Sequence, residues 1–171
     1  MKILVRIFLF FLVLAVVAYI YGRSIPAHQT HTRTIALKQT PEAVFGLLTD
    51  LPNFPKWNPN MEKIEMLPPI DGKEATRQTF KGNMVMTIIT SESTPPKHLV
   101  RSMGDSGGPF EGSWIYDITP TADGSQIALT EQSTYNSVLF RLMSKMFSPT
   151  KYMDEHLQGM AKQYGETAVI H

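Results

Sequence analysis

The spacing of apolar and polar residues divides this chain of 171 residues into three parts. The first part is an apolar run from Ile7 to Tyr21. Short stretches of alternating apolar and polar residues follow, and the chain closes with apolar residues three and four positions apart. Alternation is typical of strands and the wider spacing is typical of helices. The pattern therefore predicts an apolar N-terminal helix, followed by a domain that combines strands with helices.

The N-terminal run is long enough to cross a membrane. From Ile3 to Tyr21 it has 19 residues broken only by Arg6, and as a helix it would measure about 28 Å. This length spans a bilayer core if Arg6 extends to the interface. Two interpretations stay open: a retained anchor, or a cleaved signal peptide that begins with Lys2 and Arg6. The anchor is favoured, because residues 19–21 continue the apolar run past a poor cleavage site.

The charges that flank the run predict its orientation. Lys2 and Arg6 crowd the short tail before it, which favours a globular domain on the extracytoplasmic side. Basic residues on the other flank, Arg23 among them, weaken this preference. We assign residues 1–23 to the anchor or signal segment, 24–30 to a linker and 31–167 to the globular domain.

The alternating stretches predict an antiparallel sheet, because short connections rich in glycine, proline and asparagine separate successive strands. The loop from Gly104 to Pro109 is glycine-rich, but it lacks the lysine and the following helix of a phosphate loop. We expect it to form a mobile rim at the mouth of a cavity. The predicted strands are Thr32–Leu37, Lys63–Leu67, Ala75–Phe80, Met84–Thr90, Leu99–Met103, Trp114–Thr119 and Gln126–Tyr135.

Helices are predicted after the first strand and at the C-terminal end. Thr40 caps a short helix with Pro41 in its first turn, and Pro52 permits a second short helix. Two apolar stripes near the end indicate a long helix that Ser148-Pro149 would restart or kink, and that Gly165 ends. The stripes are Leu139, Leu142, Met143, Met146 and Phe147, and Met153, Leu157, Met160, Ala161 and Tyr164.

This order of elements resembles the START-like (SRPBCC) superfamily, in particular its polyketide cyclase/dehydrase-like members. The resemblance covers Thr30 to Glu166 and is carried by residues 40–59, by Gly107–Tyr116 and by Leu129–Glu131. It implies an α+β helix-grip fold, in which a curved antiparallel sheet wraps around a long C-terminal helix and two short helices follow the first strand. It also implies a cavity between the sheet and that helix. The family includes both ligand carriers and enzymes.

Composition narrows the classes of function. With 16 basic and 15 acidic residues, and no basic stripe, the chain lacks the electrostatic basis for binding nucleic acid. It has no cysteine, which excludes disulfides and thiol catalysis. Its five histidines show no metal-ligand spacing, so we expect neither a metal nor a cofactor. Its ten methionines either line an adaptable apolar cavity or fill gaps in an ordinary core.

Two titratable residues are weak catalytic candidates. Glu131 shares a strand face with Leu129, so it points inward if Leu129 does. There it would act as a general acid or base, hold a polar ligand group, or pair with Arg77 or Arg101 on neighbouring strands. His156 is the only histidine on the predicted long helix. It either reaches the cavity or, as we expect, flanks the apolar stripe at the solvent boundary.

The resemblance, taken with the strand pattern, predicts which side chains line the cavity. These side chains are apolar or aromatic apart from Glu131, and they come from the predicted strands and the last helix. They are Met84, Met86, Ile88, Met103, Trp114, Tyr116, Glu131, Tyr135, Met153 and Leu157.

Three functional hypotheses follow. The favoured one is a membrane-tethered module that binds a lipid or another hydrophobic small molecule, since a tether keeps an apolar-ligand carrier beside the phase that dissolves its ligand. The second is a cyclase, dehydratase or hydrolase with Glu131 as its acid or base. The third is an interaction domain whose own side chains fill the cavity. A filled cavity would support the interaction domain, and an open apolar cavity would support the carrier. An open cavity with a buried, unpaired Glu131 would support the enzyme.

Overall fold

The structure is a computed structural model that describes residues 2–104, 107–146 and 150–171. Its strands form one seven-stranded antiparallel sheet in the order β1-β7-β6-β5-β4-β3-β2, which confirms the predicted α+β helix-grip fold. The elements are α1 (Lys2–Ser24), β1 (His28–Leu37), α2 (Pro41–Thr49), η1 (Leu51–Asn53), α3 (Phe54–Trp57), β2 (Met61–Ile70), β3 (Lys73–Phe80), β4 (Met84–Thr94), β5 (His98–Met103), β6 (Phe110–Thr121), β7 (Gly124–Tyr135), α4 (Val138–Met146) and α5 (Lys151–Gln163).

Short connections between successive strands produce the meander from β2 to β7. At the β2–β3 turn, Asp71 and Gly72 both have positive φ, 50° and 74°, as a two-residue hairpin turn requires. β1 then pairs with β7 along its whole length, from His28 opposite Thr134 to Leu37 opposite Ser125. The first strand of the domain is therefore an edge of the sheet beside the last.

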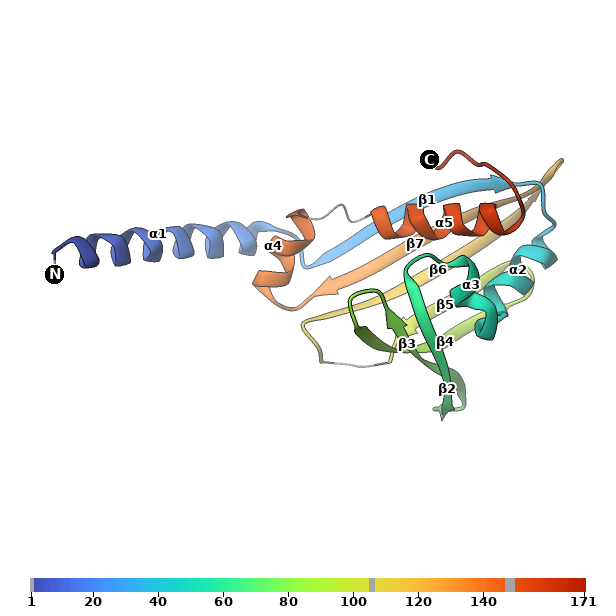
Figure 1. The fold of residues 1–171 in the computed structure, drawn as a ribbon, viewed down its shortest axis with the longest axis horizontal. Helices are drawn as coiled ribbons and strands as arrows, with labels where there is room; N and C mark the ends of the chain where they lie inside the picture. Colours follow the sequence, from blue (N-terminus) through green and yellow to red (C-terminus); the bar gives the residue numbers. More distant parts are fainter. Residues whose placement is uncertain (1, 105–106, 147–149) are drawn as a thin grey trace.

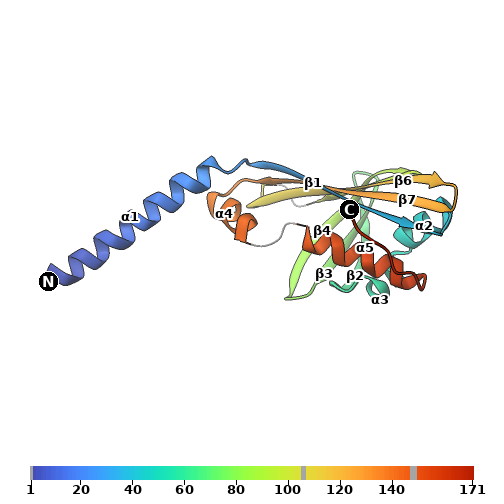
Figure 2. The same ribbon diagram turned by 90° about the horizontal axis from the view of Figure 1, so that it is seen from above.

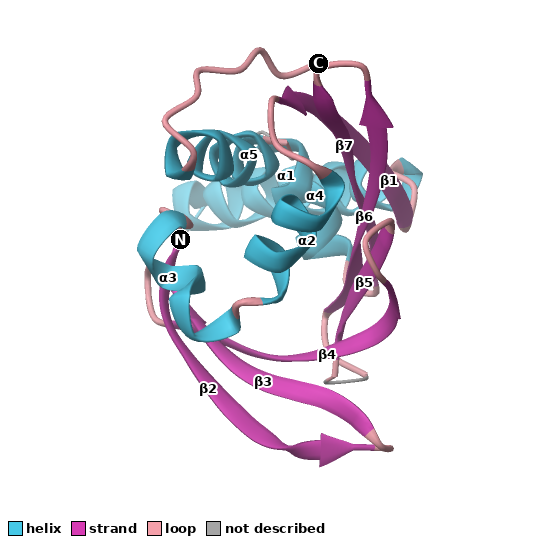
Figure 3. Cartoon of the chain, turned by 90° about the vertical axis from the view of Figure 1, so that its right-hand side faces the viewer, coloured by secondary structure: helices cyan, strands magenta, loops and turns pink. Residues whose placement is uncertain are grey.

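The sheet curves around α5, and α2 and α3 lie with α5 on its concave side (Figures 1 and 3). Arg33 of β1 fixes the start of α5: its Nε donates to Asp154 Oδ1 at 2.9 Å and its Nη2 donates to Thr150 Oγ1 at 2.9 Å. The core between the helices and the concave face is apolar. Its members include Ile35, Phe80, Leu99, Tyr116 and Ile127 from the strands, and Val44, Leu48, Met153, Leu157 and Met160 from the helices.

The helix signals in the sequence are partly confirmed. Thr40 is the N-cap of α2, with its hydroxyl accepting from the Ala43 N–H at 3.3 Å, and Pro41 begins the helix. The predicted long C-terminal helix consists of two described helices, α4 and α5. Of the two predicted alternatives, a restart and a kink, this arrangement matches the restart. The proposed break at Ser148-Pro149 lies outside the described residues, as do positions 105 and 106 of the predicted glycine-rich rim.

All seven strands are longer than predicted, and two of the extensions run through segments predicted as a linker and a turn. β1 begins at His28, inside the segment predicted as a linker, because residues 28–30 pair with residues 132–134 of β7. β2 continues through Pro68-Pro69 to Ile70, where the sequence predicts a turn. β2 is an edge strand, and an edge tolerates proline because one side of it has no partner that needs the missing N–H.

α1 projects from one end of the domain, beyond α4 (Figures 1 and 2). By length and composition it is the one described helix that could cross a membrane. Its only buried residue is Gly22, and none of its residues belongs to the core of the domain. α1 thus lies outside that core and packs on α4 through Gly22.

Gly159 provides a test of the packing between α5 and α3. A Cβ at this position would lie 2.3 Å from the Trp57 carbonyl oxygen, so Gly159→Ala should lower the free energy of unfolding by about 1–3 kcal/mol. Gly46→Ala in α2 is the matched control, because a Cβ there meets open space and alanine favours the helix by up to about 1 kcal/mol. Thermal unfolding in detergent micelles measures both. Equal midpoints for the two variants would contradict the predicted close packing.

Candidate ligand-binding site

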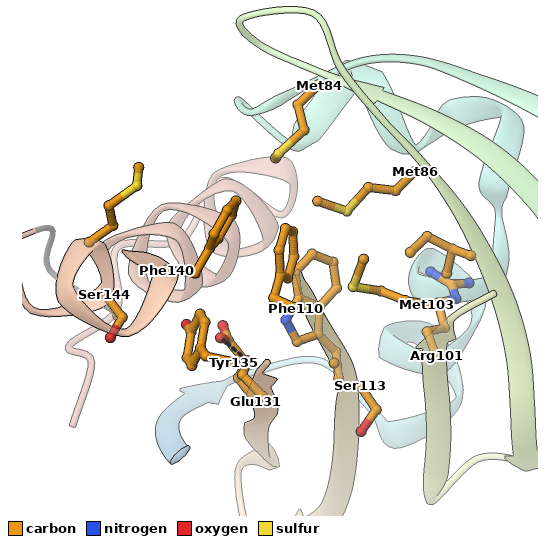
Figure 4. Close-up of a pocket in the computed structure, with 15 residues that line it drawn as sticks. Met84, Met86, Arg101, Met103, Phe110, Ser113, Glu131, Tyr135, Phe140 and Ser144 are labelled. Atoms are coloured by element: carbon orange, nitrogen blue, oxygen red, sulfur yellow. Dashed lines mark hydrogen bonds between the residues drawn. The ribbon is translucent and has the colours of Figure 1, made fainter. Parts of the chain in front are cut away.

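A cavity of about 340 Å³ lies between the concave face of the sheet and α4, and Figure 4 shows the side chains around it. Its volume is at the lower end of the range for small-molecule sites. Its wall is formed by Met84, Met86, Ile88, Arg101, Met103, Phe110, Gly112, Ser113, Trp114, Glu131, Ser133, Tyr135, Phe140, Met143 and Ser144.

The period of the strands explains which residues reach the cavity. Side chains on a strand alternate between its two faces, so the cavity is lined mainly by every second residue of four adjacent strands, with Ser113 of β6 as the exception. β4 contributes positions 84, 86 and 88, β5 contributes 101 and 103, β6 contributes 110, 112 and 114, and β7 contributes 131, 133 and 135. α4 closes the remaining side with Phe140, Met143 and Ser144.

Aromatic contacts separate the cavity from the core. Trp114 stacks on Tyr152 of α5 with ring centroids 5.3 Å apart, and it meets the edge of Phe80 at 6.4 Å. Near α4, Phe110 stacks on Phe140 at 5.6 Å. Trp114 and Tyr152 thus form a partition, with the cavity on one side and the packed end of α5 on the other.

The cavity has an open end and a closed end. Met84 and Met143 line it and are still 46% and 39% exposed, so its mouth lies between the start of β4 and α4. Arg101 also lines it but is only 4% exposed. Figure 4 shows Arg101 on the far side of the cavity from α4. The arginine therefore belongs to the closed end.

Three residues on neighbouring strands form a row across the cavity wall. Arg101 of β5 lies opposite Trp114 of β6, and Trp114 lies opposite Glu131 of β7. The indole thus stands between the one cation and the one carboxylate among the described wall residues. Adjacent strands are about 4.8 Å apart, so the backbones that carry these two charges are roughly 10 Å apart.

The Glu131 carboxylate is held within its own strand. Its Oε1 accepts from Ser133 Oγ at 2.7 Å. Among the ion pairs of the described residues none includes Glu131, so the predicted pairing with Arg77 or Arg101 is wrong. The strand order gives the reason, because β6 separates β7 from Arg101, and β6, β5 and β4 all separate it from Arg77. Burial and the nearby Glu131 charge raise the pKa of Tyr135.

Arg101 is the only wall residue that carries a positive charge. Its Nη2 donates to the Leu48 carbonyl oxygen at 2.6 Å, and its guanidinium carbon lies 5.4 Å from the centre of the Phe54 ring. Its Nε is buried and has no hydrogen-bond partner. Burial lowers the pKa of Arg101, against smaller opposing effects of Tyr116 and Glu74.

The sequence profile of the polyketide cyclase/dehydrase and lipid transport family matches residues 28–165, from the start of β1 to just beyond α5. The chain belongs to this family. No curated protein sequence matches this chain. Among the described residues no group of three histidine, aspartate or glutamate side chains is placed to hold a metal ion.

Solved structures of family-like proteins share the fold at low sequence identity. The di-domain ARO/CYC StfQ from the steffimycin biosynthetic pathway matches with a TM-score of 0.66 and 9% identity, over 81% of this chain and 52% of that one. The chain thus spans about half of StfQ. The Zhui aromatase/cyclase from a Streptomyces species matches with a TM-score of 0.63 and 14% identity, over 81% and 93%. A START superfamily protein from Mycobacterium smegmatis matches with a TM-score of 0.59 and 14% identity, over 80% of this chain and 98% of that one.

Within this family fold, the structure brings together seven of the ten side chains predicted to line a cavity. Met84, Met86, Ile88, Met103, Trp114, Glu131 and Tyr135 all border it. The other three, Tyr116, Met153 and Leu157, are fully buried in the core beyond the Trp114–Tyr152 partition. Whether the seven contact a ligand stays a prediction.

Several wall residues were missed. Phe110 and Gly112 continue the alternation of Trp114, but the glycine-rich stretch before Trp114 hides this extension of β6. Arg101 is two positions from Met103 and shares its face, a signal that the sequence offered. The α4 residues Phe140 and Ser144 had no such signal, because the side of a helix that faces a cavity depends on its neighbours.

His156, the second catalytic candidate, is not at the solvent boundary as predicted. It is buried in the core beneath Phe54 and Trp57, with ring centroids 5.6 Å and 5.0 Å away. Its Nε2 is 3.2 Å from the Tyr116 hydroxyl, and its Nδ1 has no partner. The aromatic residues of α3 cover a helix position that would otherwise be a boundary position, so His156 does not reach the cavity.

The burial of His156 predicts a dependence of stability on pH. Burial, with a smaller effect of the Arg101 charge, lowers the pKa of His156 to about 3, whereas an unfolded histidine has a pKa of about 6.5. The unfolded state therefore takes up a proton first as the pH falls. We expect this group to lower the free energy of unfolding by about 1.4 kcal/mol per pH unit between about pH 6.5 and pH 3, and to have no such effect above that window.

Denaturant titrations of the full chain in detergent micelles at about pH 7 and about pH 4.5 measure this decline. His156→Gln should remove most of it, while His28→Gln, at an exposed position on β1, should leave it in place. An unchanged decline in His156→Gln would show that other groups cause it.

Proposed function

We propose that the protein is a membrane-tethered module that binds a lipid or another hydrophobic small molecule in the cavity between the sheet and α4. The observation that carries this proposal is the wall of the cavity. Methionine and aromatic side chains make up most of it, and flexible methionines adapt to apolar ligands of different shape. The few polar groups would orient the ligand.

The position of the mouth supports the tether. The Gly22 Cα of α1 lies so close to α4 that an added Cβ would be 2.6 Å from Val138 Cγ1 and 2.9 Å from Leu142 Cγ. The other side of α4 lines the cavity with Phe140 and Met143. One short helix thus contacts both the proposed anchor and the cavity, so a membrane around α1 would lie near the mouth.

The composition of α1 and α4 adds to this support. Leu139 of α4 is 62% exposed, and an exposed apolar side chain beside an anchor suits the membrane interface. The first turns of α1 carry Lys2 and Arg6, which favours a domain on the extracytoplasmic side. Because a signal peptide has the same composition, the tether requires that α1 stay attached to the domain in the mature protein.

Family and neighbours support ligand binding and leave an enzyme as a second candidate. The family's own description names lipid transport beside cyclases and dehydrases, and Zhui is an aromatase/cyclase. The observation that favours an enzyme is Glu131, a carboxylate in the cavity wall beside Tyr135. The open volume disfavours the third hypothesis, an interaction domain with a filled cavity.

Substitutions in the wall should reduce the amount of bound ligand. Met86→Arg places a charge in an apolar cavity and should lower it about tenfold or more. Trp114→Ala removes the partition and should also lower it. Deletion of residues 1–21 should have a smaller effect than either, because α1 does not line the cavity. Mass spectrometry of organic extracts from the purified proteins measures bound ligand per chain.

The matched control is Met66→Arg, since Met66 is an exposed methionine on the edge strand β2. It should retain the ligand of the unmodified protein. Full retention in Met86→Arg and Trp114→Ala would refute the cavity as the binding site. Loss on deletion of residues 1–21 alone would instead place the ligand around α1.

Glu131→Gln separates the carrier from the enzyme. Glutamine keeps the size of the side chain but cannot transfer a proton as an acid or base. A carrier should retain its extracted ligand within about twofold, whereas an enzyme should lose turnover by about a hundredfold or more. The measurement is chemical identification of the bound compound in both proteins. A different compound in Glu131→Gln, such as an unconverted precursor, would favour the enzyme.

A further inference from the structure

The closed end of the cavity contains a cation without an anionic partner. Arg101 is 4% exposed, yet the ion pairs of the described residues do not include it. It makes one described hydrogen bond, from Nη2 to the Leu48 carbonyl oxygen, and its Nε has none. One guanidinium donor, the Nε–H, is therefore unused in a residue that lines an apolar cavity.

A buried charge of this kind is costly unless an anion compensates it. The acidic side chain of the same wall, Glu131, lies beyond Trp114 in the row across the strands. The Glu131 carboxylate accepts a hydrogen bond from Ser133 Oγ. Glu74, whose charge raises the pKa of Arg101 by less than burial lowers it, accepts a hydrogen bond from Thr90 Oγ1 on the exposed side. Among the described residues no side-chain anion is thus paired with the guanidinium.

The chemistry of the wall determines what kind of anion fits. Between Arg101 and the mouth the wall is formed by apolar side chains such as Met86, Met103 and Phe110. A ligand that reaches Arg101 must therefore be apolar along most of its length. A single guanidinium balances a single negative charge, and its planar donors match the two oxygens of a carboxylate.

We propose that the ligand is a carboxylate amphiphile of the fatty-acid type, with its carboxylate on Arg101 and its hydrocarbon tail directed to the mouth between Met84 and Met143. This proposal rests on the proposed binding function and specifies its ligand class. Glu131 limits the ligand further, since a second anionic group along the tail would be repelled by its carboxylate. The preferred ligand thus has one charged end and one neutral end.

The test compares decanoate with decanol, which share a tail and differ in the head group. The full chain is placed in lipid nanodiscs at a pH that keeps decanoate ionised. Binding is followed by the fluorescence of Trp114, with Trp114→Phe showing how much of the signal comes from the cavity. Because a hydrogen bond to a charged group is worth about 1.5–3 kcal/mol, decanoate should bind about tenfold to hundredfold more tightly than decanol.

Arg101→Met should abolish this preference and leave decanol binding within about threefold of its original value, since methionine is apolar and of similar length. Arg77→Met on β3 is the matched control, because Arg77 is exposed and outside the cavity wall, and it should keep the full preference. Circular dichroism checks the fold of each variant. If Arg101→Met does not fold, Arg101→Lys provides the second variant, and a reduced preference is expected because the planar fork is lost.

The outcomes separate the two proposals. Equal binding of decanoate and decanol to the unmodified protein, or an undiminished preference in the folded Arg101 variant, overturns the carboxylate class and leaves cavity binding intact. Failure of both compounds to change Trp114 fluorescence overturns cavity binding together with the ligand class. A preference that Arg101→Met removes and Arg77→Met keeps supports the assignment.

Discussion

The length of α5 relative to the strands is the constraint from which the site follows. α5 has 13 residues and measures about 20 Å, whereas β6 and β7 have 12 residues each and measure about 40 Å. One helix therefore covers only part of the concave face. The covered part is the dry core around Met153, Leu157 and Met160. The remainder, under α4, is where the sheet leaves a cavity.

Some of the buried polar groups that lack hydrogen-bond partners lie at or near the boundary between these two parts. Besides the Arg101 Nε, the Tyr152 hydroxyl and the Nδ1 of His156 lack hydrogen bonds, and burial raises the pKa of Tyr152. Such groups reduce stability when they are buried unpaired. They lie on the core side of the partition or at the closed end of the cavity, where a well-packed apolar core would be more stable. The fold tolerates this cost next to a cavity.

The sequence was sufficient for the fold and for one side of the site. The period of two placed Met84, Met86 and Ile88 on one face, and it did the same for Glu131 and Tyr135, because alternation along a strand is a local property. It could not tell which part of that face α5 covers, so Tyr116 and Met153 were assigned to the cavity although they lie in the core.

The helices show why the other side of the site could not be predicted from the sequence. The apolar stripe of α4 indicates a buried side but not its neighbour, which depends on the approach of Gly22 from the other end of the chain. His156 was misplaced for a similar reason, because Phe54 and Trp57 cover it only after α3 has packed on α5. Contacts between elements far apart in sequence decide both cases, and local patterns do not contain them.

The row of Arg101, Trp114 and Glu131 limits both functions considered for this family member. A ligand anchored at Arg101 places only the part roughly two strand spacings away, about 10 Å, beside Glu131. A carrier needs no more than this, because one group fixes the head and the other excludes a second anion. An enzyme must in addition bring a proton that is to be transferred within hydrogen-bond reach of Glu131. Its substrate would need a reactive carbon in mid-chain, well removed from the charged end. For a substrate held by Arg101, the separation of the two charges would thus place any chemistry at Glu131 in the middle of its chain.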